Sequence, residues 1–176
     1  MIPTLHTRRL TLRPYRRADF DGYAAFMCSD RATYMGGPFD REKAWAWFTN
    51  DVSTWALYGF GTLAMVYHGR LAGGVGLVHP PHFPEPECGW FVLDGFEKLG
   101  LATEGGRAML DHAFATTDLI SIVSYVHVDN AASIRVAEKL GGARATAAAK
   151  PAGEGEDTFV IGHLGGGPSL ARGRQT

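Results

Sequence analysis

Charge of one sign, long apolar runs and cysteine are all scarce in this sequence. Its 176 residues include 17 Lys and Arg against 18 Asp and Glu, for a net charge of −1, and the charges are mixed along the chain. Nucleic acids and anionic membranes recruit basic patches, so we expect neither as a partner. No apolar run approaches the roughly 20 residues of a membrane-spanning helix, and the N-terminus lacks the apolar core of a signal peptide.

The cysteines and histidines also argue against stabilising disulfide bonds and a bound metal. The two cysteines, Cys28 and Cys88, cannot build a disulfide framework, and a reducing compartment suits them better. We therefore expect a cytoplasmic protein. His79 and His82 have a spacing that suits a metal, but their proline-rich loop offers no matching cysteine or carboxylate pair. We therefore expect no metal site.

The apolar content is sufficient for one core. Hydrophobic residues make up 45% of the sequence, and internal repeats are absent, which predicts a single domain over residues 1–164. From Gly165 onward glycine, proline, serine and arginine dominate. Residues 165–176 are therefore predicted to form a flexible tail.

Hydrophobic periodicity predicts alternating strands and helices. The predicted helices cover residues 18–28, 41–55, 102–114 and 130–141, with Asp40 as the N-cap of the second. Its buried face is predicted to contain Ala44, Trp47, Phe48 and Val52. The first predicted strand ends at Pro14. The others cover residues 59–67, 70–78, 87–93, 119–128 and 158–163, and residues 143–148 are a candidate partner for the last. This order favours an α/β sandwich of the α+β type with a mixed sheet.

The most informative segment joins a strand to a helix between Leu93 and Phe114. The preceding run ECGWFVL is apolar, and the following apolar residues fall on one helical stripe. The backbone N–H groups of residues 97–102 would converge where the helix begins. A helix start offers unpaired donors and the positive end of a dipole, which suits a phosphate or diphosphate. The alternative is a plain strand-to-helix turn with a glycine at the helix start.

Three segments in order resemble one known family. Glu97-Lys-Leu-Gly-Leu-Ala102 resembles the (Gln/Arg)-x-x-Gly-x-(Gly/Ala) segment by which GNAT N-acetyltransferases hold the pyrophosphate of acetyl-coenzyme A (acetyl-CoA). The run SYVHVDNAASIRVAEKLG, residues 124–141, resembles the second characteristic segment of the RimJ/RimL branch, which acetylates protein N-termini. The opening LHTRRLTLRP, residues 5–14, is similar to the first strand of that branch. Together the resemblance covers most of residues 4–164.

The resemblance implies a fold, a reaction and a set of binding residues. It implies a GNAT-type fold, with helices flanking a mostly antiparallel sheet. The implied enzyme is an N-acetyltransferase that moves an acetyl group from acetyl-CoA to a primary amine, on a protein N-terminus or a small molecule, by direct attack. Its cofactor-binding residues would be Phe91, Val92, Leu93, Lys98, Leu99, Gly100, Leu101, Ala102, Thr103, Asn130 and Ser133. The backbone of the first three would pair with the pantetheine arm.

Three positions depart from the family pattern. Glu97 stands where the family has Gln or Arg, and Leu99 stands where a basic residue is frequent. A carboxylate near a diphosphate is unfavourable, although Lys98 offsets part of its charge. Ala137 stands where many relatives have a tyrosine that acts as general acid. Ser133 is therefore the candidate that protonates the thiolate, directly or through water.

Candidate residues for the amine side come from two strands. Glu87 opens the strand beside the cofactor and is our first choice for the general base, because partial burial would raise its pKa. The alternatives are an exposed carboxylate at a strand end, or a water that relays the proton to Glu87. Tyr125 and His127 share one face of the next strand and are candidates for the substrate pocket, although a histidine there is also a common structural residue. Asn130 and Ser133 equally fit a helix cap, which is compatible with catalysis.

Two other functions fit the same residues. A module that binds acyl-CoA without turnover would also keep the phosphate loop, and the missing tyrosine favours it. A thioester hydrolase would need a positioned water and would act without any amine. The sequence is compatible with a monomer and with a homodimer.

Overall fold

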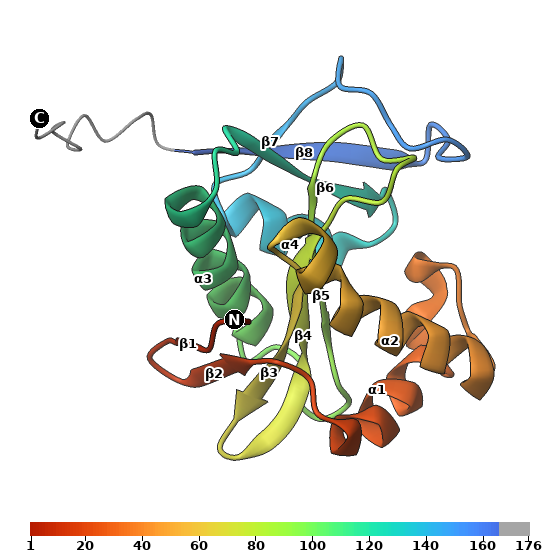
Figure 1. The fold of residues 1–176 in the computed structure, drawn as a ribbon. Coiled ribbons are helices and arrows are strands. Elements are labelled where there is room, and N and C mark those ends of the chain that lie inside the picture. Colours follow the sequence, from red (N-terminus) through yellow and green to blue (C-terminus); the bar gives the residue numbers. More distant parts are fainter. Residues whose placement is uncertain (166–176) are drawn as a thin grey trace, which may run out of the picture.

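A computed structural model describes residues 1–165 of the chain (Figure 1). All of the predicted tail except Gly165 lies outside the described residues. The α-helices are α1 (Phe20–Met27), α2 (Arg41–Tyr58), α3 (Leu101–Thr116) and α4 (Ala131–Lys139), and the 3-10 helices are η1 (Arg17–Asp19) and η2 (Asp30–Met35). The strands are β1 (Leu5–His6), β2 (Leu10–Arg13), β3 (Thr62–Tyr67), β4 (Arg70–Val78), β5 (Glu87–Val92), β6 (Ser121–His127), β7 (Ala143–Arg144) and β8 (Thr158–Leu164).

The strands form one mixed sheet in the order β1-β2-β3-β4-β5-β6-β8-β7. Neighbouring strands are antiparallel except for β5 and β6, which are parallel. Helices α1 and α2 lie on one face of the sheet, and α3 lies on the other (Figure 1). The predicted class, helices around a mostly antiparallel sheet, is confirmed.

Local sequence signals account for most element ends. The Asp40 carboxylate accepts a hydrogen bond from the Lys43 amide at 2.7 Å and so caps α2 as predicted. Gly59, with φ +73°, ends that helix. His68 and Gly69 both have positive φ, at 48° and 76°, and join β3 to β4 as the predicted two-residue turn.

The buried face of α2 differs from the prediction. The helix buries Ala44, Phe48, Asp51 and Trp55 among others, whereas the side chain of Val52 is 41% exposed and Trp47 lies at the surface. The buried face contains positions 44, 48, 51 and 55. A prediction that follows only apolar residues leaves out the aspartate at position 51. Predicting the buried face from apolar residues alone was therefore wrong at positions 47 and 52.

Two short elements also differ from the prediction. Residues 30–35 form η2, which ends at Gly36 with φ +83°, and a segment this short carries no hydrophobic periodicity that could predict it. The predicted partner of the last strand, residues 143–148, shrinks to the two residues of β7.

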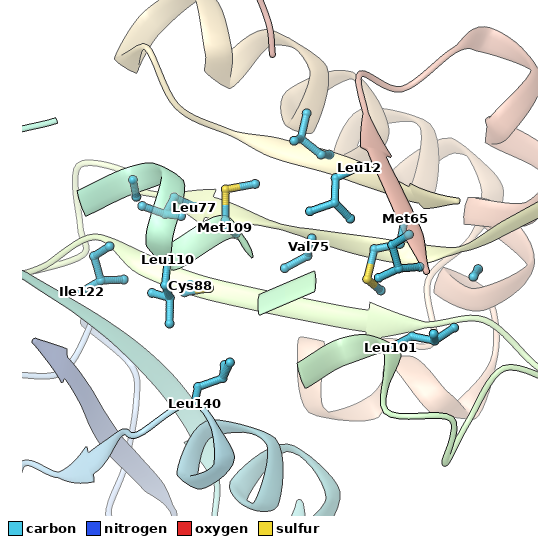
Figure 2. Packing of buried hydrophobic residues seen from close by; sticks show 14 of the residues in the cluster. Leu12, Met65, Val75, Leu77, Cys88, Leu101, Met109, Leu110, Ile122 and Leu140 are labelled. Atoms are coloured by element: carbon cyan, nitrogen blue, oxygen red, sulfur yellow. The ribbon is translucent and has the colours of Figure 1, made fainter. Parts of the chain in front are cut away.

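Each face of the sheet has its own core. Between the sheet and α3, a cluster that includes Leu12, Met65, Val75, Leu101 and Met109 is buried, as Figure 2 shows. On the other face, α1 and α2 close over an aromatic cluster that includes Phe20, Tyr23, Phe26, Phe48 and Phe91. The two cores fix the sheet between the helices and hold α3 against β4 and β5.

Strands β5 and β6 separate soon after they meet. The one paired position is Glu87 opposite Val123, and the Val123 amide donates to the Pro86 carbonyl at 2.9 Å. Beyond this point β6 diverges from β5 and keeps only β8, with which it pairs along its whole length, and α4 follows it (Figure 1). A gap therefore opens in the middle of the sheet, with Glu87 at its closed end.

Candidate active site

Two clefts meet over the gap between β5 and β6. We call the one at the start of α3 the cradle cleft, with a volume of about 570 Å³, and the one beside Glu87 the acid cleft, with about 380 Å³. The residues that line both clefts are Tyr34, Met35, Trp90, Phe91, Asn130 and Ser133. A molecule held in one cleft thus lies next to a molecule held in the other.

The cradle cleft has the backbone geometry of an anion site. Lys98 and Gly100 both have positive φ, at 59° and 78°, and turn the chain sharply into α3. The Glu104 amide donates to the Gly100 carbonyl at 3.1 Å, so the amides of residues 101–103 precede the hydrogen-bond ladder of the helix. No side chain caps α3. These donors and the helix dipole favour a phosphate here.

The charged side chains of the cradle cleft are mainly cationic. Its charged residues are Arg31, Lys98, Arg135, Lys139 and Glu97. Arg31 Nη1 lies 2.7 Å from Glu97 Oε1. A hydrogen bond from its own backbone amide, together with the Arg31 charge, lowers the pKa of Glu97. The Glu97 carboxylate, which departs from the family pattern, is therefore paired with Arg31, a residue that the sequence analysis did not identify.

The register of β5 decides which of its peptide groups face the gap. The Leu93 amide donates to the Ala72 carbonyl at 2.8 Å, and Phe91 is opposite Gly74 in β4. Because alternate peptide groups of a strand point to opposite sides, those of Trp90 and Val92 face the gap. Arg31 Nη2 donates to the Val92 carbonyl at 2.8 Å.

The acid cleft is built around two carboxyl groups. Glu87 is partly buried and accepts a weak hydrogen bond, 3.4 Å long, from the Tyr125 amide across the split between the strands. Burial raises the pKa of Glu87 to about 7, and the charge of Glu154 adds to the shift. Asp51 is 7% exposed, and its burial likewise raises the pKa to about 7. A carboxylate with a pKa near 7 suits a general base.

Tyr125 and His127 line the acid cleft on the same side of β6. The Tyr125 hydroxyl is buried and has no hydrogen-bond partner among residues 1–165. The His127 ring lies 5.1 Å from the ring of Tyr34 in η2, and its Nδ1 accepts from the Asp129 amide at 3.2 Å. Tyr34 and His127 thus face each other where the two clefts meet.

Asn130 and Ser133 lie where the clefts join. Asn130 Oδ1 accepts a hydrogen bond from the Ser133 amide at 3.1 Å, which caps α4. The cap uses the amide of Ser133 and leaves its hydroxyl free for another partner. Ala137 is fully buried and lines neither cleft, so its position offers no acid.

The structure brings most of the predicted residues together. Those that line the cradle cleft are Phe91, Val92, Lys98, Gly100, Leu101, Ala102, Thr103, Asn130 and Ser133. Neither cleft is lined by Leu93, which packs against the aromatic cluster on α1, or by Leu99, which is 42% exposed. Sequence reasoning missed Arg31, Tyr34 and Asp51. Of these three, only Asp51 could have been identified from the sequence, because it is a polar residue on the helical stripe that contains Ala44 and Phe48.

Within residues 1–165, no group of three or more His, Cys, Asp or Glu side chains could hold a metal ion. None of the helices in that part of the chain has the length and apolar character to cross a membrane.

A cleft with free amides and cations that meets a cleft with carboxyl groups at a break in the sheet is the arrangement expected of a group-transfer enzyme. The acetyltransferase (GNAT) domain family matches residues 9–143. The chain belongs to this family and is an N-acetyltransferase that uses acetyl-CoA. The superfamily assigned from the three motifs is confirmed.

Solved structures agree with this assignment. An acetyltransferase from Agrobacterium tumefaciens strain C58 is 40% identical, with a TM-score of 0.88, over 94% of this chain and 96% of that one. A GNAT-family acetyltransferase from Bordetella pertussis is 24% identical, with a TM-score of 0.76, over 92% and 99% of the chains. RimL, a ribosomal L7/L12 alpha-N-protein acetyltransferase solved with coenzyme A, has the same fold at 15% identity, with a TM-score of 0.73, over 92% and 98%.

Proposed function

We propose that this chain acetylates a primary amine by direct attack, with Glu87 as the general base and Ser133 as the proton donor to the departing thiolate. The acceptor is a small-molecule amine or a protein N-terminus. The observation that carries the proposal is the opposite charge of two clefts that meet at one gap. Cations and free amides line one cleft, and the other contains carboxyl groups, one of them Glu87 at the start of β5.

The cradle cleft fits the cosubstrate. The diphosphate would be held by the amides of residues 101–103 with Lys98, and the pantetheine arm would follow the gap-facing peptide groups of Val92. Bound acetyl-CoA supplies the acetyl group as a thioester. Glu97 does not oppose this because Arg31 holds its carboxylate.

On the acceptor side, the chain's own residues handle two protons. The Glu87 carboxylate accepts a proton from the incoming ammonium or amine, directly or through one water, and a pKa near 7 leaves it largely ionised above neutral pH. The Ser133 hydroxyl lies at the junction of the clefts and can give its proton to sulfur. Neither role needs a covalent bond to the enzyme. Cys88 is fully buried, and burial raises the pKa of its thiol, which makes it a poor nucleophile.

A thiol-release assay with acetyl-CoA and a panel of amines tests the proposal. Release that depends on the amine, with an acetylated amine identified by mass spectrometry, is the expected result. Equal release without any amine would indicate a thioester hydrolase instead. Calorimetric binding of acetyl-CoA with no release under any condition would indicate a binding module.

A further inference from the structure

Asp51 is a buried carboxyl group of the acid cleft that the acetyl transfer step leaves unused. It lines the cleft from α2 with 7% of its surface exposed. It accepts hydrogen bonds from the Tyr23 hydroxyl at 2.9 Å and from the Thr62 hydroxyl at 3.4 Å. Both partners are neutral, and no Lys or Arg occurs among the described residues that line this cleft. A buried carboxylate is normally paired with a cation.

Two glycines of β4 let neighbouring groups approach the sheet closely beside this carboxyl group. Gly74 and Gly76 line the cleft in β4, and a Cβ at these positions would lie 2.1 Å from the Tyr15 hydroxyl and 2.3 Å from Thr62 Cα. The Tyr15 hydroxyl is itself buried without a hydrogen-bond partner in the described part of the chain. A buried hydroxyl without a partner among the described residues therefore lies against Gly74, which lines the cleft.

A cationic ligand would supply the positive charge that the Asp51 carboxylate lacks. Burial without a cation raises the pKa of Asp51 to about 7, and an ammonium group in contact would favour the ionised form. The rest of the lining suits a cation as well, because it includes Glu87, Trp47, Phe91 and Tyr125. Aromatic faces attract cations, and lining carboxylates repel anionic acceptors.

We propose that Asp51 binds a second ammonium group of the acceptor, so that the substrate class is a small molecule with two amines. One amine reaches Glu87 and is acetylated, and the other is held at Asp51. This inference rests on the proposed function and names the substrate class for the same site.

The sheet register gives the separation of Glu87 from Thr62, the strand residue that contacts Asp51. Thr62, which contacts Asp51, is opposite Gly76 in β4, and Glu87 lies one strand further and two residues along. Two strand spacings and two residue steps separate the Cα atoms of Thr62 and Glu87 by roughly 12 Å. Both carboxyl groups face the cleft between them, so a linker of several methylene groups fits.

The test compares α,ω-diamines of three to six carbons with n-alkylamines of the same length. Thiol release gives kcat/KM for each acceptor, and calorimetry in the presence of coenzyme A gives the affinity. We expect the wild-type protein to prefer the best diamine over its matched monoamine by roughly tenfold or more. The substitution Asp51→Asn keeps the shape, accepts the Tyr23 hydrogen bond through its amide oxygen and can donate to the Thr62 hydroxyl through its amide nitrogen. It should lower the diamine kcat/KM to the level of the matched monoamine.

Glu154→Gln is the matched control, because it removes one carboxylate from the exposed rim of the same cleft. It should leave the preference within about twofold of wild type. A wild-type protein that turns over both acceptor types equally would overturn the inference and leave the proposed function standing. A preference that survives in a folded Asp51→Asn protein would overturn it too. Absence of thiol release with every amine would instead refute the proposed function.

Discussion

Replacing Glu87 by glutamine should lower activity and raise stability at the same time. Gln keeps the side-chain length and an oxygen that accepts the Tyr125 amide hydrogen bond. It removes the group that takes the proton, and a positioned base contributes roughly 10²–10⁴-fold to a rate. We expect kcat/KM to fall by about that factor, while calorimetric affinity for acetyl-CoA stays unchanged.

The stability gain follows from the raised pKa. In the folded protein the pKa of Glu87 is about 7, against 4.5 for a free carboxyl group. Below pH 4.5 the group is protonated in both states and contributes nothing. As pH rises from 4.5 to 7 the unfolded chain ionises first, so the wild-type protein loses stability. The full difference corresponds to roughly 3 kcal/mol above pH 7, and solvent screening of a partly exposed group reduces it to about 1–2 kcal/mol.

Two measurements check this reasoning. Thermal unfolding at pH 8 should show Glu87→Gln melting roughly 3–6 °C above wild type, and the two proteins should melt together at pH 4. The wild-type kcat/KM should rise with pH and level off above about 7, as a base with that pKa requires. A variant with full activity would refute the base assignment. Lower stability at pH 8 would show that the carboxylate is structural.

Three further predictions concern the cradle cleft and the proton donor. Gly100→Ala should cost about 1 kcal/mol of stability for its positive φ and also weaken acetyl-CoA binding, whereas Gly141→Ala, with the similar φ of +85° away from both clefts, should cost the same stability only. Unfolding curves and calorimetry on both variants decide this. Arg31→Gln should weaken acetyl-CoA binding severalfold by freeing the carboxylate of Glu97, and adding Glu97→Gln should restore part of the affinity in a double-mutant cycle. Ser133→Ala should lower kcat by about tenfold or more with little change in melting temperature, because the helix cap uses the backbone amide; equal kcat would rule out the proton-donor role.

The sequence predicted those parts of the fold that local patterns encode. The caps at Asp40 and Asn130, the turn at His68 and the start of α3 at Gly100 all follow from short-range chemistry. The cradle cleft was predictable for the same reason, because its donors are consecutive amides. Membership of the acetyltransferase family followed from three such segments in order.

The acid cleft could not be predicted in the same way, because its residues come together only in the folded chain. Asp51, Glu87 and Tyr125 belong to three separate elements. The pairing of β5 with β6 brings Glu87 and Tyr125 together, and the packing of α2 on the sheet adds Asp51. Arg31 was missed because η2 is too short to show a periodic pattern. The net charge of −1 also averages out a cationic and an acidic cleft, so it gave no indication of either.

The two outermost strands of the sheet have a consequence for how the protein behaves in concentrated solution. Strands β1 and β7, at opposite ends, contain two residues each. The unpaired N–H and C=O groups of an edge strand can form hydrogen bonds with a strand of another chain, and a very short edge strand offers few such groups. The longer, apolar strand β4 lies inside the sheet and pairs with β3 and β5 along its length. The arrangement therefore disfavours fibrillar self-association through the sheet without help from the net charge.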